Sequence, residues 1–219
     1  MKLQIWILGP MMLCCASAAL AASSADEGPT ESFAKCIVAR APDAAKRGLI
    51  EFWAPSKYVS DIGPPVVRAC ASGGVGIGYS PDFRHALAFE WLRRNEELLA
   101  PISFDAVPEL SHDAIEGDVL RRVPAGQSAE DSKAQHEAVR NQQRALSEIG
   151  ECVVRGHPNE VRQLLRHRAD PGVTTAVVPF LGECVPAKAK LHLEPDYLTG
   201  LLALTYVRLA LMAQGVAAQ

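Results

Sequence analysis

Two stretches decide the fold of this chain, Phe33-Ala-Lys-Cys-Ile-Val-Ala-Arg-Ala-Pro-Asp43 and Ile149-Gly-Glu-Cys-Val-Val-Arg-Gly-His-Pro-Asn159. They align without a gap, so that Cys36 corresponds to Cys152, 116 positions later (152 − 36). The pair of apolar residues that follows each cysteine and the proline four positions beyond that pair fall at the same offset. We interpret the chain as one helical unit that is written twice.

A second match supports this interpretation. Cys70 corresponds to Cys184, and Pro81-Asp82-Phe83 corresponds to Pro195-Asp196-Tyr197, now 114 positions apart (184 − 70). The shared positions hold apolar residues, cysteines, prolines and an aspartate at a helix start, all of which have structural roles. The sequence therefore predicts an all-α protein built as a tandem duplication of a four-helix, disulfide-stapled unit. The first repeat covers 32–99, a linker covers 100–127, and a long helix with the second repeat covers 128–214.

The composition sets the broad class of protein. The chain has 219 residues, 48% of them hydrophobic, which is enough for a substantial core. Its formal net charge of −3 argues against nucleic-acid binding, which needs a basic face or stripe. Aromatic residues make up only 6% and alanine is abundant, a balance that favours close-packed helices over a sheet.

Residues 1–22 have the pattern of a secretory signal peptide. Lys2 supplies a positive start, Ile5–Leu13 is apolar, and small residues precede a cleavage site near Ala21 or Ala22. The apolar run is shorter than the roughly 20 residues that span a bilayer. Neither cysteine of this segment follows the small residue that a lipoprotein signal requires. We therefore expect a periplasmic or secreted protein, with 23–31 as a flexible mature N-terminus.

Four cysteines remain after cleavage, namely Cys36, Cys70, Cys152 and Cys184. An even number in an exported chain indicates disulfides, and four cysteines allow three connectivities. If the two copies fold alike, the pairs are Cys36–Cys70 and Cys152–Cys184, each joining the first helix of a half to its third. Each closes a loop of about 33 residues, which stabilises the fold by about 3–4 kcal/mol in the chain-entropy model. None of these cysteines has the close spacing that structural zinc sites require.

Capping and proline signals predict the helix boundaries. A short two-stranded ribbon from Ile77–Tyr79 and Leu191–Leu193 is an additional expectation, because both pieces alternate apolar and other residues. The expected helices are a first one capped by Thr30 or Ser32 and ending near Ala39, Pro42–Ile50, a short one from Pro65 to Cys70, Pro81–Leu99, Ala129 to about Val154, Pro158–His167, a short one from Pro179 to Cys184, and Pro195–Ala213.

The last helix is apolar enough to raise the question of a membrane span over Leu198–Val216. Arg208 lies near its middle, and an arginine at that depth costs several kcal/mol in lipid. We therefore expect a buried core helix and no transmembrane span in the mature chain.

The repeated pattern consists of a Cys-Ile/Val-Val stretch, a proline that opens a helix, a second cysteine, and Pro-Asp-Phe/Tyr before an alanine- and leucine-rich helix that carries an arginine. It resembles uncharacterised exported proteins of sphingomonad-type alphaproteobacteria, over Phe33–Arg94 and Ile149–Arg208. The resemblance implies an exported address and a helical fold plan, and it brings no activity, cofactor or site residue.

Several motifs invite a chemical interpretation. The glycine-rich stretch Gly73–Gly78 follows a helix and is followed by no Gly-Lys-Ser/Thr, so a connector is favoured over a phosphate cradle. His85 lies beside Arg84 with no positioned partner in the sequence, and we expect it at the solvated rim of the fold. No histidine is spaced from another histidine or a cysteine as metal ligands are. We accordingly predict no catalytic, cofactor-binding or metal-binding residue.

One constellation remains open. His112-Asp113 in the linker could orient a serine nucleophile, the candidates being Ser111, Ser128 and Ser147. No strained Gly-x-Ser-x-Gly turn occurs.

Three functions are compatible with these observations. The leading hypothesis is a non-enzymatic exported protein, structural or binding, with an unknown protein or small-molecule partner in a groove between its halves. The alternatives are an exported hydrolase with a noncontiguous site and a peripheral envelope protein that uses its apolar C-terminal helix.

Overall fold

The computed structural model describes residues 28–51, 62–71, 81–112, 128–168, 170–186 and 191–217. Within these ranges the chain forms eight α-helices, one 3-10 helix and no strand, which confirms the all-α prediction. The helices are α1 (Pro29–Arg40), α2 (Pro42–Ile50), α4 (Pro64–Cys70), α5 (Pro81–Arg94), η1 (Glu96–Leu99), α6 (Ala129–Gly156), α7 (Pro158–Arg166), α8 (Pro171–Cys184) and α9 (Pro195–Ala217). The predicted signal peptide and the stretch Gly73–Gly78 lie outside the described residues.

Both disulfides form as predicted. Cys36 of α1 is bonded to Cys70 at the end of α4, and Cys152 of α6 is bonded to Cys184 at the end of α8. The Cα–Cα separations are 5.5 and 5.8 Å. Each bond therefore ties the first helix of a half to its third.

The joint between the first two helices of each half has nearly the same backbone conformation. Ala41 has φ −141° and ψ 59°, and His157, 116 positions later, has φ −135° and ψ 54°. In both halves the joint residue donates its N–H to the carbonyl four positions before it, at 2.8 and 2.9 Å. A proline occupies the first position of the next helix in both places, where its missing N–H has no intrahelical partner to lose.

Two predicted helix starts differ from the structure. α1 begins at Pro29, before the expected caps, because Pro29 opens the helix and the Glu31 carboxylate accepts the Gly28 N–H at 2.8 Å. The predicted flexible segment 23–31 therefore ends in helix. α8 begins at Pro171 and not at Pro179, because the Asp170 carboxylate caps the Gly172 N–H at 2.8 Å.

Two further expectations also need correction. The helix predicted to reach Leu99 ends at Arg94, because Asn95 leaves the helical conformation and its side-chain amide donates to the Trp91 carbonyl at 2.8 Å. The ribbon is not supported where the structure can be compared with it. Leu191–Leu193 is irregular, and Ile77–Tyr79 lies outside the described residues.

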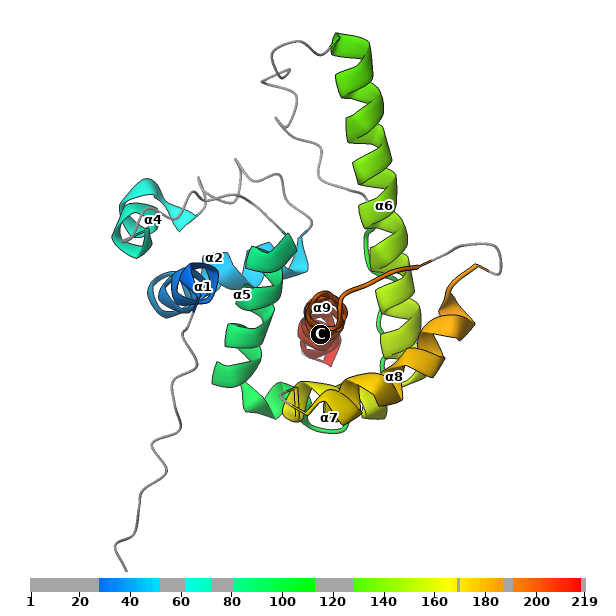
Figure 1. Ribbon diagram of the computed structural model, residues 1–219. Helices are drawn as coiled ribbons and strands as arrows, with labels where there is room; N and C mark the ends of the chain where they lie inside the picture. Colours follow the sequence, from blue (N-terminus) through cyan, green and yellow to red (C-terminus); the bar gives the residue numbers. More distant parts are fainter. Residues whose placement is uncertain are drawn as a thin grey trace, which may run out of the picture.

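The long helix α6 begins where its capping residue predicts. Ser128 accepts the Asp131 N–H at 3.0 Å, as an N-cap serine does. The N-terminal half of α6 extends away from the other labelled helices, while its C-terminal half lies beside α8 and α9 (Figure 1).

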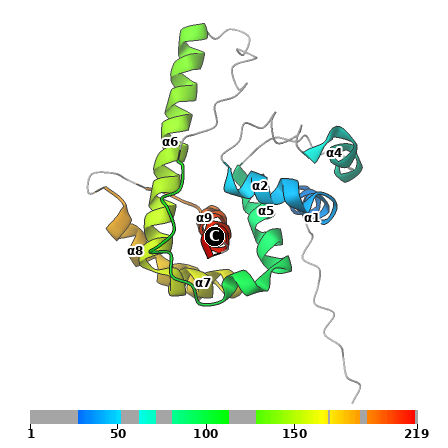
Figure 2. The same cartoon turned by 180° about the vertical axis from the view of Figure 1, so that it is seen from behind.

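The arrangement of helices centres on α9. It lies between α5 on one side and α6 on the other, and both views show α4 and α8 at opposite edges (Figures 1 and 2). Within the first half α1 packs on α5, and within the second half α6 packs on α9. The halves meet where α5 packs along α9.

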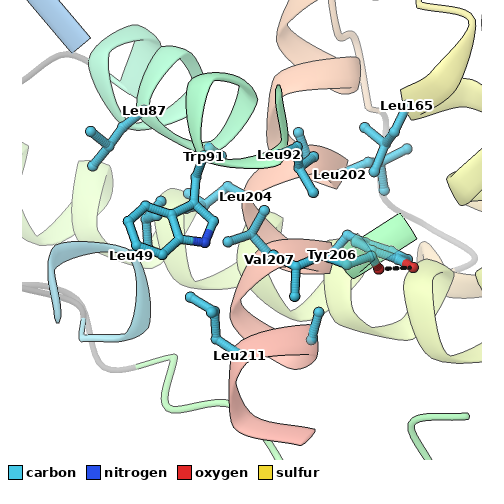
Figure 3. Packing of buried hydrophobic residues seen from close by; sticks show 14 of the residues in the cluster. Leu49, Leu87, Trp91, Leu92, Leu165, Leu202, Leu204, Tyr206, Val207 and Leu211 are labelled. Carbon is cyan, nitrogen blue, oxygen red and sulfur yellow. Dashed lines mark hydrogen bonds between the residues drawn. The ribbon is translucent and has the colours of Figure 1, made fainter. Parts of the chain in front are cut away.

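Apolar side chains of both halves form one core. Figure 3 shows Leu49 of α2, Trp91 of α5 and Leu165 of α7 packed around leucines and a valine of α9. From Leu198 to Leu211 every residue of α9 is buried. This helix is long and apolar enough to cross a membrane by length and composition, but 78% of its most apolar window lies inside the protein. Its apolar face is thus occupied by the core.

Close packing fills the contact between the halves. A Cβ added to Gly200 of α9 would overlap the ring of His85 on α5, and a Cβ added to Gly150 of α6 would come within 2.7 Å of Thr205 Oγ1 on α9. Glycine at these two crossings allows the helices to approach each other. The groove expected between the halves is therefore absent at the described α5–α9 crossing, which has no room for one methyl group at Gly200.

Candidate functional site

A group of buried and half-buried polar side chains lies where residues 104–112 contact α6 and α9. We call Ser147, Glu151, His112 and Arg208, with Arg155, the polar cluster. Its members come from α6, from α9 and from His112, which belongs to no helix, so only the folded chain brings them together.

Glu151 is the centre of the cluster. The residue is 5% exposed, although it is acidic. It lies on α6, four residues after Ser147. Both carboxylate oxygens accept the Leu110 N–H at 3.1 Å, and Oε1 accepts Arg155 Nε at 2.6 Å. His112 Nε2 lies 2.8 Å from Oε2. A buried carboxylate is retained when donors of this kind replace its water.

His112 links Glu151 to Ser147. Its other ring nitrogen, Nδ1, lies 2.9 Å from Ser147 Oγ, and Ser147 is 4% exposed. A neutral imidazole with its proton on Nε2 satisfies both contacts, since Nε2 then donates to the carboxylate and Nδ1 accepts the serine hydroxyl.

Arg208 is almost fully enclosed, at 2% exposure. Its Nη2 donates to the Ser111 carbonyl at 2.8 Å, and longer contacts reach the Ile50 carbonyl at 3.4 Å and Ser147 Oγ at 3.5 Å. Burial lowers the pKa of Arg208 to about 10, against the opposing effect of the Glu151 charge. The guanidinium is still charged at neutral pH. Arg208 thus joins the end of α2 to the stretch before α6.

Arg155 extends the cluster along the same stretch. While its Nε donates to Glu151, its Nη1 donates to the Phe104 carbonyl and its Nη2 to the Pro108 carbonyl, both at 2.6 Å. The planar guanidinium with donors in fixed directions is suited to holding several acceptors at once. Together with the Leu110 N–H and the Ser111 carbonyl, these contacts fasten 104–112 to α6 and α9.

The cluster has the elements of a serine hydrolase site. Ser147, His112 and Glu151 follow one another at hydrogen-bonding distance, as a nucleophile, a base and an orienting carboxylate do. Two features oppose catalysis. Ser147 lies inside α6 with its hydroxyl enclosed, and the Arg155 and Arg208 donors face backbone carbonyls of the chain itself.

The other predicted candidates lie elsewhere. Ser128 caps α6, and Ser111 contributes its backbone carbonyl to the cluster. Asp113, the carboxylate expected to orient His112, lies outside the described residues. The carboxylate in contact with His112 is instead that of Glu151, which was not predicted from the sequence. The available signal was the four-residue spacing of Ser147 and Glu151, which puts both on one helix face.

The prediction for His85 is wrong. It is buried between α5 and α9, with its ring 5.0 Å from the ring of Tyr197 in an edge-to-face contact. Burial and, to a smaller extent, the charge of Arg84 lower the pKa of His85 to about 4, against the opposing effect of Asp82. His85 is therefore a neutral packing residue near pH 7. Its place follows from Gly200, which leaves space for the ring.

The first half contains a smaller ionic group. Glu90 of α5 is buried, and its carboxylate accepts Arg93 Nε at 2.7 Å and Arg94 Nε at 2.6 Å. Burial alone raises the pKa of Glu90, but the hydrogen bonds and charges of the two arginines outweigh it and lower the pKa.

No group of three or more metal-ligating side chains occurs among the residues that the structure describes. Comparisons with protein-family models, with curated proteins and with solved structures gave no match.

Proposed function

We propose that this chain is an exported, non-enzymatic helical protein that acts as a structural or binding module. Its halves are tandem copies of one disulfide-stapled bundle. The matching joints at Ala41 and His157 and the matching disulfides support the duplication. The two disulfides are compatible with an oxidising compartment, and the signal-peptide pattern of residues 1–22 supports export.

One observation carries the non-enzymatic part of the proposal. The hydrogen-bonding groups of the polar cluster are directed at the backbone of 104–112 and at one another. A buried network with satisfied partners holds a unique arrangement of the chain, and it leaves no aligned group for a substrate. The cluster therefore serves to fasten the connection between the halves.

Two measurements on the intact protein test this function. We expect Glu151→Gln to lower the midpoint of thermal unfolding by several degrees, since it leaves Arg155 and Arg208 without their carboxylate. We also expect the wild-type protein to resist labelling by a fluorophosphonate probe at Ser147. Labelling of Ser147 together with hydrolysis of an ester panel would contradict the proposal.

The contacts of Ser147 and His112 favour one second candidate, an exported serine hydrolase. Ser147 Oγ would attack an ester carbonyl while its proton passes to His112 Nδ1, and Glu151 would hold the resulting imidazolium through Nε2. His112 would then return the proton to the departing alcohol, and water would release the acyl group by the same path. Arg208 Nη1, 3.5 Å from Ser147 Oγ, would face the oxyanion.

Matched variants separate the two candidates. Under the hydrolase reading, Ser147→Ala and His112→Gln abolish probe labelling and ester hydrolysis, and Glu151→Gln reduces them by a factor of a hundred or more. Under the non-enzymatic reading, the wild-type protein shows neither labelling nor hydrolysis. The same variants then differ from it only in their unfolding midpoint.

A further inference from the structure

The two disulfides differ in their access to solvent. Cys70 is part of the hydrophobic core and Cys36 packs against it. In the second half Cys184 is half-buried and Cys152 is exposed. Exchange of a disulfide requires a thiolate to reach one of its sulfur atoms, so the difference in access matters for its rate.

The helix that the second disulfide holds is weakly buried. Among the α8 residues whose side chains the structure describes, 172–184, Val177 is the one fully buried hydrophobic residue, while Val173, Phe180 and Leu181 are half-buried against the core. Val178 is 51% exposed. The C-terminal part of α8 also contacts His157. The His157 ring stacks on the Phe180 ring with 3.8 Å between their centroids, and its Nε2 lies 3.2 Å from a carboxylate oxygen of Glu183. Apart from the disulfide, α8 is therefore held by Val177, by half-buried apolar side chains and by the His157 contacts.

We propose that the Cys152–Cys184 disulfide is a thiol-operated clasp that releases α8. The reactant is an external dithiol, either a small molecule or a protein. One of its thiolates attacks Cys152 Sγ and forms a mixed disulfide, while the Cys152–Cys184 bond breaks and Cys184 leaves as a thiolate. The second thiol of the reactant then displaces Cys152. The dithiol is oxidised to its disulfide, Cys152 and Cys184 are reduced to thiols, and no proton is gained or lost overall.

Reduction of this bond removes the covalent restraint on a helix that has one fully buried side chain, Val177, and otherwise half-buried contacts. The C-terminal turn of α8 then opens and exposes Val177 and Phe180, which adds apolar surface to that already present at Val178. The first half does not respond in this way, because its disulfide is shielded by the core.

Graded reduction of the native wild-type protein tests the chemistry. The protein is incubated with dithiothreitol for increasing times, free thiols are alkylated, and peptides are quantified by mass spectrometry. We expect Cys152 and Cys184 to be alkylated at least tenfold faster than Cys36 and Cys70. Equal rates, or faster alkylation of the first pair, would overturn the proposal.

Hydrogen exchange tests the release. In the singly reduced protein, amides of 173–184 should exchange at least tenfold faster than in the oxidised protein, with α1 and α5 unchanged. The paired variant Cys152→Ser with Cys184→Ser should reproduce this effect, and Cys36→Ser with Cys70→Ser should leave α8 protected. If the paired variants do not fold, the chemically reduced wild-type protein carries the test. Unchanged exchange in α8 after reduction would refute the release.

Discussion

Lys35 on α1 and Glu151 on α6 stand at matching positions, 116 residues apart (151 − 35), in the first helix of each half. Lys35 is exposed, whereas Glu151 is buried and bonded to a backbone amide, a histidine and an arginine. Arg94 and Arg208 match in the same way at an offset of 114, and Arg208 alone reaches across to the other half. The two halves share the joint conformation and the position of the disulfide. They differ in that the described buried contacts to 104–112 are made by side chains of the second half.

The prediction with the largest expected effect tests this difference between the two halves. Glu151→Ala should lower the free energy of unfolding by about 4 kcal/mol, because Arg155 and the Leu110 amide lose their acceptor and buried Arg208 loses the nearby negative charge. The control is Glu90→Ala in the first half, whose partners Arg93 and Arg94 have side chains 58% and 37% exposed. That loss should be about 1 kcal/mol or less. Chemical denaturation measures both, and similar losses would mean that the cluster has no special role.

The second prediction concerns the crossing of α5 and α9. Gly200→Ala should cost about 3 kcal/mol, since the new methyl group overlaps the ring of His85. Gly215→Ala is the matched control on the same helix, because a Cβ there meets nothing within 4 Å, and it should be neutral or slightly stabilising. Combining Gly200→Ala with His85→Ala should recover part of the loss. No coupling between the two sites in this double-mutant cycle would show that they do not touch.

The third prediction is a dependence on pH. The pKa of His85 is about 4 in the folded protein and about 6.5 when the chain is unfolded, so the unfolded state binds the proton first as the pH falls. Stability conferred by neutral His85 is complete above pH 6.5 and is lost progressively down to about pH 4. Between pH 7 and pH 5 the loss should be about 2 kcal/mol.

The variant His85→Leu isolates this contribution, because carboxylates also begin to titrate at the lower pH. Denaturation curves at pH 7 and pH 5 should show a loss that is about 2 kcal/mol larger for the wild-type protein than for the variant. The same pH dependence in both proteins would place His85 in contact with water.

The prediction with the smallest expected effect concerns the first helix of each half, α1 and α6. Gly150 of α6 matches Ala34 of α1, which already carries a methyl group in its own buried contact. Gly150→Ala should cost about 1 kcal/mol, because the methyl group crowds Thr205 at 2.7 Å. Gly156→Ala, in open space on the same helix, should be neutral or stabilising. Thermal unfolding of the two variants should therefore shift in opposite directions.

Local patterns in the sequence predicted much of the fold. Proline and capping residues indicated most helix starts, and the common spacing of the cysteines indicated their pairing. The C-terminal helix was correctly predicted to be buried from its apolar character and from Arg208. Each of these inferences depends on chemistry within one turn of the chain or on the match between the halves.

The remaining features depend on contacts between distant segments. The burial of His85 follows from the absence of a side chain at Gly200, more than 100 residues away, and no pattern around His85 indicates it. The carboxylate partner of His112 was sought at its neighbour Asp113, but the tertiary fold supplies Glu151. The start of α8 was missed because Asp170-Pro171-Gly172 is also typical of a plain turn.

The central claim is that the polar cluster fastens 104–112 to the helices, and the exchange rate of the Leu110 amide tests it most directly. We expect a protected Leu110 N–H in the wild-type protein, because Glu151 accepts it in a buried position. We also expect exchange at least tenfold faster in Glu151→Gln, with α1 amides unchanged. Rapid exchange of Leu110 in the wild-type protein would contradict it.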